Sequence, residues 1–309
     1  MARPIISVIM LTYNRENLVG RAIESVLKQV TPPQLYFEFI IVNNGSTDKS
    51  GEIAEEYAKK DRRISVIHLE HGKNIGTGRN VGLDAARGDF ITFIDDDDWC
   101  EPDFLCFLYN LAIENNADVA ICGDFDKIFD EKLVMTAQEA LIELMWRKRY
   151  NMAFPTKLFS KKLADQLRFP EEGVFDDIAL MYKLLAKADK VAYHGLPKYT
   201  FHRHENNNSN WTTNHSLITA EILDEYLTAY RKRTIWLSER FPEEKATWQY
   251  FEWSFMISMV EKIHRLQVAC EKKLAYMTDE LSKNYYNFAK SPHVLDFEKK
   301  WLKMYINKN

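Results

Sequence analysis

The segment FITFIDDDDWCEPDF (residues 90–104) leads from an apolar, strand-like run into four consecutive aspartates, Asp95 to Asp98. Neighbouring carboxylates repel one another and are costly to remove from water, so this arrangement calls for positive charge nearby. Carboxylates in a turn can converge on a hard divalent cation, Mg²⁺ or Mn²⁺, which prefers oxygen ligands. The alternative is a solvated acidic loop that caps a helix beginning near Pro102. The position of the aspartates at the end of a buried strand favours a cation site.

Strand-like and helical segments alternate along the first half of the chain. Apolar runs typical of buried strands lie at 5–11, 37–42, 64–69, 89–94 and 117–122, and helical spacing of apolar residues lies at 17–30, 47–60, 75–88 and 102–116. This alternation predicts an α/β fold with a Rossmann-like, mostly parallel sheet and helices on both faces. Ligands of such sheets bind at the carboxyl ends of the strands. The polar sequences TYN, NNGSTD and DDDD, which follow the first, second and fourth strands, are therefore expected to form one site.

The last third of the chain has a different pattern. From residue 216 onward it shows helical periodicity, many aromatic residues and no strand signal. We therefore expect one domain over 1–215 and a helical region of about four helices over 216–309. An aromatic stripe at helical spacing is usually core. An acceptor-binding wall, a dimer interface and a membrane-surface contact through Arg231, Lys232 and Arg233 remain open as other roles for this region.

Composition narrows the class of protein. The 309 residues are 46% hydrophobic and 28% charged, which is ordinary for a globular protein, and the net charge of −4 argues against general nucleic-acid binding. The four cysteines show no CxxC spacing, which favours buried thiols in a reducing compartment. The apolar run near the N-terminus is short and lacks a small-residue cleavage site, and no segment approaches the ~20 apolar residues of a membrane span. A cytoplasmic protein is expected, with peripheral contact at the inner face of the membrane left open.

Two further motifs carry amide and guanidinium groups to the expected site. In NNGSTD (43–48), turn and helix-capping chemistry accounts for Gly45 to Asp48 but not for Asn43 and Asn44. The amides of these two residues offer donors and acceptors, as the edge of a nucleobase does. In GKNIGTGRN (72–80), Arg79 near a helix start can grip diphosphate oxygens, although a surface salt bridge explains it equally well.

Two later motifs are ambiguous by themselves. Asp176 and Asp177 stand at a predicted helix start, where acidic residues commonly complement the helix dipole but can also act as a general base. His202 and His204 precede a polar loop, where a histidine can complete the coordination of a metal or contact a leaving phosphate. An exposed strand end explains the histidines equally well.

Together these segments resemble the family-2 glycosyltransferases, inverting enzymes with the GT-A nucleotide-sugar-binding fold. The resemblance covers roughly residues 4–205. It rests on SVIMLTYNRENLVGRAIESVLKQ, on IIVNNGSTDKSGEIAEEYA and above all on GKNIGTGRNVGLDAARGDFITFIDDDDW. The joint order and spacing of these pieces are much more specific than any one of them.

The resemblance implies a nucleotide-sugar donor site. Thr12 and Tyr13 would contact the uridine, with Tyr13 stacked on the base, and Arg79 would touch the diphosphate. Asn44 takes the position where the family often has an aspartate that pairs with uracil. Because both acidic positions of the usual D-D-G-S are asparagines here, the preference for uridine is open.

The resemblance also implies the reacting groups. Asp95 and Asp96 would contact the ribose or the metal, Asp97 would be the principal ligand of Mn²⁺ or Mg²⁺, and all four aspartates would serve the metal and its nucleotide-sugar. Asp177 would be the catalytic base, and His202 would reach the metal or the diphosphate.

The expected function is inverting transfer of a sugar from a UDP-linked donor to a hydroxyl of a saccharide or lipid-linked acceptor, in surface polysaccharide biosynthesis. Neither the sugar, the acceptor nor the oligomeric state follows from the sequence, and a homo-oligomer stays open. A sugar-nucleotide pyrophosphorylase or a dehydrogenase would need glycines after the first strand, where LTYNRENL has none, and no G-x-S-x-G elbow indicates a hydrolase. A non-catalytic nucleotide-sugar-binding or scaffold protein remains the alternative. The Asn43–Asn44 pair favours that alternative, whereas the retained Asp177 argues against it.

Overall fold

The computed structural model describes residues 5–70, 74–125, 128–171, 176–205, 207 and 210–306, with the backbone alone at Asp176. The chain forms two compact units, Met1–His202 and Arg203–Asn309. The division falls between residues 202 and 203, whereas the sequence pattern predicts it between residues 215 and 216. Each unit is described by itself.

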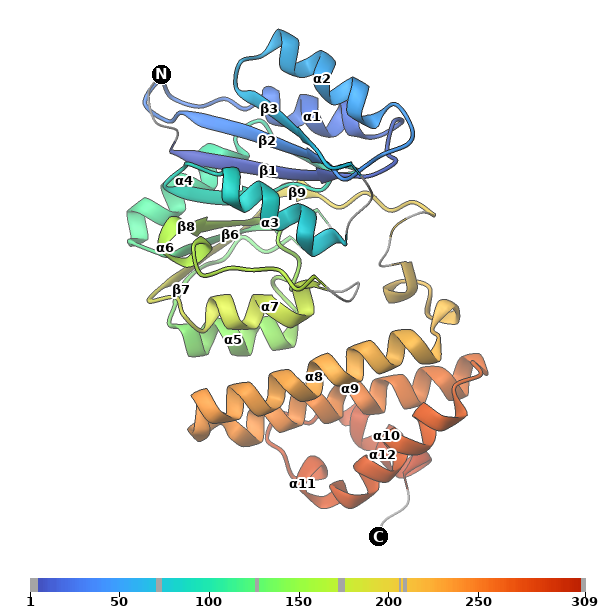
Figure 1. The fold of residues 1–309 in the computed structure, drawn as a ribbon. Helices are drawn as coiled ribbons and strands as arrows, with labels where there is room; N and C mark the ends of the chain where they lie inside the picture. Colours follow the sequence, from blue (N-terminus) through green and yellow to red (C-terminus); the bar gives the residue numbers. More distant parts are fainter. Residues whose placement is uncertain are drawn as a thin grey trace. The chain divides into compact units, whose positions relative to one another are not determined.

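The first unit is built on one nine-stranded sheet within the described residues. Its strands are β1 (Ile6–Thr12), β2 (Phe37–Asn43), β3 (Ile64–His68), β4 (Phe90–Phe93), β5 (Trp99–Cys100), β6 (Val119–Asp124), β7 (Lys132–Met135), β8 (Lys157–Ser160) and β9 (Val191–Thr200). They lie in the order β3-β2-β1-β4-β8-β6-β9-β5, and β7 pairs with β9 (Figure 1). β3, β2, β1 and β4 are parallel, and β6 pairs in parallel with β9. β8 is antiparallel to both of its neighbours, β4 and β6.

Helices cover both faces of this sheet, as the sequence predicted (Figure 1). They are α1 (Val19–Leu27), α2 (Ser50–Lys60), α3 (Ile75–Ala85), α4 (Phe104–Asn115), α5 (Ala137–Trp146), α6 (Lys161–Ala164) and α7 (Asp176–Leu185). Alternate residues of β1 face opposite sides of the sheet. Val8 belongs to the core that α1 and α4 complete, while Ile9 and Leu11 lie against α3. Gly82 and Gly78 allow that approach, because a Cβ at either position would collide with Ile9 or Leu11.

The register of the parallel strands brings their carboxyl ends to one edge. Thr12, the last residue of β1, stands opposite Asn43, the last residue of β2. β4 pairs with the other side of β1, and the amide of Ile94 donates to the carbonyl of Ile9 at 3.0 Å. The loops that follow β1, β2 and β4 therefore leave the sheet side by side.

The second unit is entirely helical over its described residues. It contains α8 (Ala220–Arg240), α9 (Lys245–Leu266), α10 (Glu271–Lys283), α11 (Tyr285–Ala289) and α12 (Asp296–Tyr305), with 3₁₀ segments at Asn210–Thr212, His215–Leu217 and Pro242–Glu244. The aromatic stripe of α9 is mostly core, as expected, since Trp248, Tyr250, Phe251 and Trp253 are all buried. Among the described helices of the whole chain, none has the length and apolar character needed to span a membrane.

Candidate active site

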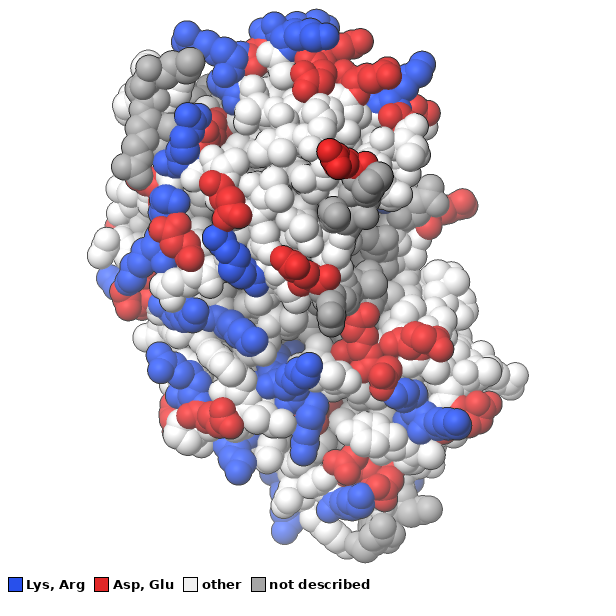
Figure 2. Space-filling view, in the orientation of Figure 1, with Lys and Arg blue, Asp and Glu red and all other residues white. Residues whose placement is uncertain are grey.

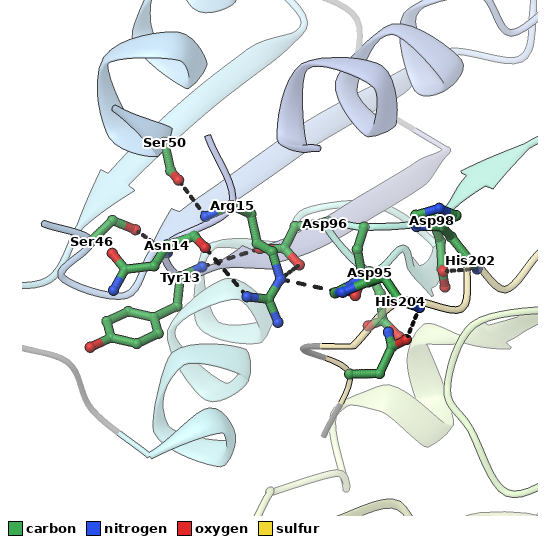
Figure 3. Close-up of polar contacts among 12 residues, drawn as sticks. Tyr13, Asn14, Arg15, Ser46, Ser50, Asp95, Asp96, Asp98, His202 and His204 are labelled. Carbon is green, nitrogen blue, oxygen red and sulfur yellow. Dashed lines mark hydrogen bonds and ion pairs between the residues drawn. The ribbon is translucent and has the colours of Figure 1, made fainter. Parts of the chain in front are cut away.

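Backbone and side-chain hydrogen bonds tie the loops after β1 and β2 together. The amide of Asn44 donates to the carbonyl of Thr12 at 2.9 Å, and the amide of Asn14 donates to the Ser46 hydroxyl at 3.1 Å. The amide of Arg15 donates to the Ser50 hydroxyl at 2.7 Å (Figure 3). The hydroxyls of Ser46 and Ser50 therefore hold the neighbouring loop.

The loop after β1 also contacts the aspartate segment. The amide of Tyr13 donates to Oδ2 of Asp96 at 3.1 Å. Thr12 is buried, whereas the Tyr13 residue is 48% exposed, and Figure 3 shows its ring pointing away from the aspartates. A ring presented in this way is available for stacking, and the predicted base contact of Thr12 and Tyr13 stays a prediction.

Arginines surround the first three aspartates. Nε of Arg15 lies 3.9 Å from an Asp96 oxygen and 4.0 Å from an Asp97 oxygen. Arg79 of α3 approaches Asp95 at 3.4 Å. The positive charge that the four aspartates called for is therefore supplied in part by the protein itself.

The environment of Asp96 makes its ionisation unfavourable. Burial, followed by the charge of Asp97, raises the pKa of Asp96 to about 7, against the lowering effects of the Thr12 hydroxyl, Arg15 and the Tyr13 amide. Additional positive charge at this place would favour the ionised carboxylate. This is the electrostatic property expected where a cation binds.

Asp98 differs from the other three aspartates. It is 3% exposed, and its oxygens accept hydrogen bonds from the Tyr199 hydroxyl at 2.8 Å and from the His202 amide at 2.7 Å. The Tyr199 hydroxyl in turn accepts the amide of Asp95 at 3.1 Å. Burial, with the charges of Asp95 and Asp97, raises the pKa of Asp98 to about 8. Asp98 therefore anchors the loop to β9, and its expected role towards the metal or the nucleotide-sugar stays a prediction.

The side chains that could bind a metal here offer carboxylate oxygens, which are hard ligands. The side chains of Asp95, Asp96 and Asp97 are 39%, 13% and 12% exposed, so all three retain some access to solvent. Carboxylates suit Mg²⁺ or Mn²⁺, which commonly completes its coordination with water and phosphate oxygens. Within the described part of the chain, no group of three or more His, Cys, Asp or Glu side chains is arranged to hold a metal by itself. The residues fit a cation that shares its coordination with a bound substrate.

His202 is placed by its backbone at the same loop. Its amide holds Asp98, and its ring centroid lies 5.7 Å from that of Trp99. The guanidinium carbon of Arg21 lies 4.1 Å from the Trp99 ring centroid, and Arg21 also donates to the carbonyl of Asp97 at 2.8 Å. The metal or diphosphate contact of His202 stays a prediction.

Asn43 has a structural role at the end of β2. Its Oδ1 accepts the amide of Ser46 at 3.1 Å, and its Nδ2 lies 3.0 Å from Nδ1 of His68. Because Nδ2 can only donate, Nδ1 of His68 must accept, and Nε2 then donates to Glu55 at 2.9 Å. Asn44 is also buried. The base contact of Asn44 stays a prediction.

Two predicted residues lie on helices. The guanidinium of Arg79 stands beside the rings of Phe169 and Phe154, at 5.4 and 5.9 Å from their centroids, so its contact with Asp95 is made from a supported position. Asp177 lies in the first turn of α7, where its Oδ1 accepts the amide of Ile178 at 2.8 Å. The assignment of Asp177 as the base stays a prediction.

Sequence reasoning did not identify Arg15, Arg21 and Tyr199. A signal existed for Arg15, because it directly follows the TYN sequence at the end of β1. Tyr199 offered no local signal, since it is separated from Asp98 by 101 residues.

Comparison with known proteins supports the fold and gives the family. EpsH of Bacillus subtilis (strain 168), named as a glycosyltransferase, is 34% identical over 219 residues, which are 66% of this chain and 62% of EpsH. TuaG of the same organism, named as a glycosyltransferase of teichuronic acid biosynthesis, is 28% identical over 194 residues, which are 60% of this chain and 73% of TuaG. The chain thus spans less than two thirds of the length of EpsH.

A solved structure shows the same fold over nearly the whole chain. The S. aureus TarS fragment 1–349, crystallised in complex with UDP-GlcNAc, aligns with a TM-score of 0.58 and 20% identity, covering 96% of this chain and 78% of the fragment. The fold is that of the GT-A glycosyltransferases. Residues 7–183 match the family model described as Glycosyl transferase family 2. On this match, the chain belongs to glycosyl transferase family 2.

Proposed function

We propose that the protein is an inverting glycosyltransferase that moves a sugar from a nucleotide-diphospho-sugar to a hydroxyl of its acceptor. The observation that carries the proposal is the convergence of the loops after β1, β2 and β4. The Tyr13 amide binds Asp96, and the Asn44 amide binds the Thr12 carbonyl. An exposed aromatic ring, a buried amide and paired carboxylates thereby share the edge where sheets of this kind bind ligands.

The donor that we propose is a UDP-sugar. Tyr13 would stack on the uracil, Asn44 would hydrogen-bond its edge, and Arg79 would contact the diphosphate. The TarS fragment, which shares this fold, was crystallised in complex with UDP-GlcNAc, and this supports a UDP-sugar as the first donor to test. Asn44 is proposed for the base because it takes the position where the family often has the aspartate that pairs with uracil, while Asn43 accepts the Ser46 amide and lies beside His68.

Mn²⁺ or Mg²⁺ would be held by Asp95, Asp96 and Asp97, with Asp97 as the main ligand. His202, which follows the end of β9, would reach the metal or the diphosphate. When bound, such a cation neutralises the negative charge that develops on the leaving diphosphate. Arg79 and Arg15 are placed to add positive charge beside the same carboxylates. Asp98 and Tyr199 hold the loop so that these groups need not reorganise as the charge develops.

The displacement that we propose has one step. The acceptor oxygen forms a bond to the sugar C1 carbon as the bond from C1 to the diphosphate oxygen breaks, and the acceptor proton passes to the carboxylate of Asp177. Attack on the face opposite the leaving group inverts the anomeric centre. We propose a saccharide or a lipid-linked saccharide as the acceptor, in surface polysaccharide biosynthesis, in keeping with the name of TuaG.

A binding screen followed by a transfer assay tests this proposal. UDP-, GDP-, CMP- and dTDP-sugars are each added with and without Mn²⁺, and the apparent melting temperature is measured, since a ligand of the folded state raises it. We expect a metal-dependent rise with a UDP-sugar, and hydrolysis or transfer of the same sugar. A rise without hydrolysis or transfer would favour the non-catalytic binder, and no rise with any donor would contradict the donor site.

A further inference from the structure

The basic run on α8 presents only part of the cationic surface that the sequence left open. Arg233 is 2% exposed, and its guanidinium carbon lies 3.9 Å from the centroid of the Tyr230 ring. Arg231 is paired with the buried Glu252 at 3.2 Å. On the face shown in Figure 2, basic and acidic side chains are interspersed.

The last helix, α12, is fixed in orientation by a buried carboxylate. Glu298 is 2% exposed and accepts hydrogen bonds from the Tyr250 hydroxyl at 2.9 Å and the Ser254 hydroxyl at 2.5 Å, both on α9. It also accepts the amide of Leu295 at 2.9 Å, just before α12 begins. Leu302, one turn further, is buried on the same side. This face of α12 is therefore committed to its own unit.

The outer side of α12 carries large apolar side chains. Phe297 is 50% exposed and Met304 is 59% exposed, and the partly exposed Trp301 lies between them in sequence. Positions 297, 301 and 304 follow the i, i+4, i+7 spacing that places residues along one stripe of a helix. The rings of Phe297 and Trp301 are in contact, with centroids 4.8 Å apart. We call Phe297, Trp301 and Met304 the α12 stripe.

Unpaired lysines border the α12 stripe. Lys300 and Lys303 are exposed, and neither has an ion-pair partner among the residues that the structure describes. The only acidic residue on the outer side of α12 is Asp296, which lies 3.3 Å from Lys299. Exposed aromatic and apolar residues beside uncompensated lysines are the pattern of a helix that lies at a lipid–water interface.

We propose that the α12 stripe, with Lys300 and Lys303, docks on an anionic membrane surface. The apolar side chains would enter the boundary of the acyl chains while the lysines contact lipid phosphates. A two-fold dimer through the same surface would bring Lys300 and Lys303 towards their own copies, and this like-charge contact favours the lipid as the partner. The inference goes beyond the proposed function and does not depend on it.

Vesicle co-sedimentation of the full chain tests this inference. Phosphatidylglycerol-containing vesicles are compared with pure phosphatidylcholine vesicles, at low and at high salt. We expect binding to the anionic vesicles alone, weakened by salt. The double variants Lys300→Glu/Lys303→Glu and Phe297→Ser/Met304→Ser should each lower the partition coefficient at least about tenfold, because a basic residue near the surface and buried apolar area both contribute to binding.

Matched substitutions on the first unit serve as controls. Lys59→Glu reverses the charge of an exposed lysine on α2, and Ile113→Ser removes a 54% exposed apolar side chain from α4. Neither control should change the partition coefficient more than about twofold. The inference would be overturned by equal binding to both kinds of vesicle, by no binding, or by equal losses in the controls. It would also be overturned if size measurements showed a dimer that Phe297→Ser/Met304→Ser dissociates.

Discussion

The loop of Asp95 to Asp98 and the helix α12 each place like charges close together. Only the loop has opposite charges of its own unit beside most of them. Arg15 stands beside Asp96 and Asp97, and Arg79 stands beside Asp95. Lys300 and Lys303 have no such partner within the described chain. Charge that is partly balanced by rigid protein groups suits a small ligand bound in fixed geometry, whereas unbalanced charge on an open helix suits an extended partner.

The largest expected effect tests whether the site that contains Asp95 to Asp98 catalyses sugar transfer. Asp177→Asn should lower the rate of sugar transfer by at least about a hundredfold, because an amide cannot take the acceptor proton. Donor binding, measured by the shift in melting temperature, should remain. Asp189→Asn, an exposed aspartate in the same unit, is the matched control. Normal transfer by a folded Asp177→Asn protein would remove the base assignment.

Asp97→Asn should weaken metal binding without unfolding the protein. Replacing one carboxylate with an amide weakens a hard-cation site, so the metal-dependent rise in melting temperature should be lost while the metal-free protein stays folded. Titration with Mn²⁺ alone gives an independent measurement of affinity. An unchanged Mn²⁺ affinity would show that the cation, if bound, is held by other groups.

Metal affinity should also depend on pH in a defined direction. The pKa of Asp96 is raised to about 7, so a proton competes with the cation on that carboxylate below this pH. Mn²⁺ affinity is therefore expected to rise as the pH increases from about 6 to about 8. Calorimetric titration at several pH values, in buffers of different ionisation enthalpy, measures both the affinity and the protons released. Affinity that stays constant over this range would contradict a role for Asp96 in the site.

Asp98→Ala should destabilise the folded protein by about 2–3 kcal/mol, because it leaves the Tyr199 hydroxyl and the His202 amide buried without an acceptor. Tyr199→Phe should cost about 1 kcal/mol, since it removes one hydroxyl from the same network. Urea unfolding without metal measures both. If Asp98→Ala left stability unchanged but abolished Mn²⁺ binding, Asp98 would be a ligand after all and the anchor assignment would be wrong.

Local patterns in the sequence were sufficient to predict the part of the fold that carries the site. The apolar run over β1 and the helical period over α2 follow from local sequence, and parallel pairing brings Thr12 and Asn43 to one edge. The contact between Tyr199 and Asp98 could not be predicted in this way, because it depends on the path of β9 through the sheet. The insertion of antiparallel β8 between β4 and β6 was equally invisible, since strand order is decided by long-range packing. The same limit applied to the basic run on α8, where periodicity did not reveal that Arg233 is buried.

The smallest expected effect concerns Asn43, whose neutral amide is matched to a particular form of His68. In Asn43→Asp, one carboxylate oxygen can still accept the Ser46 amide, but the other faces Nδ1 of His68, which is an acceptor in the wild type. The variant should therefore be less stable than the wild type by about 1 kcal/mol. Urea unfolding measures this, and in a His68→Ala background the same substitution should lose most of its cost, because the facing acceptor is gone. A destabilisation that persisted in full in that background would show that Nδ1 of His68 does not set the requirement for an amide at position 43.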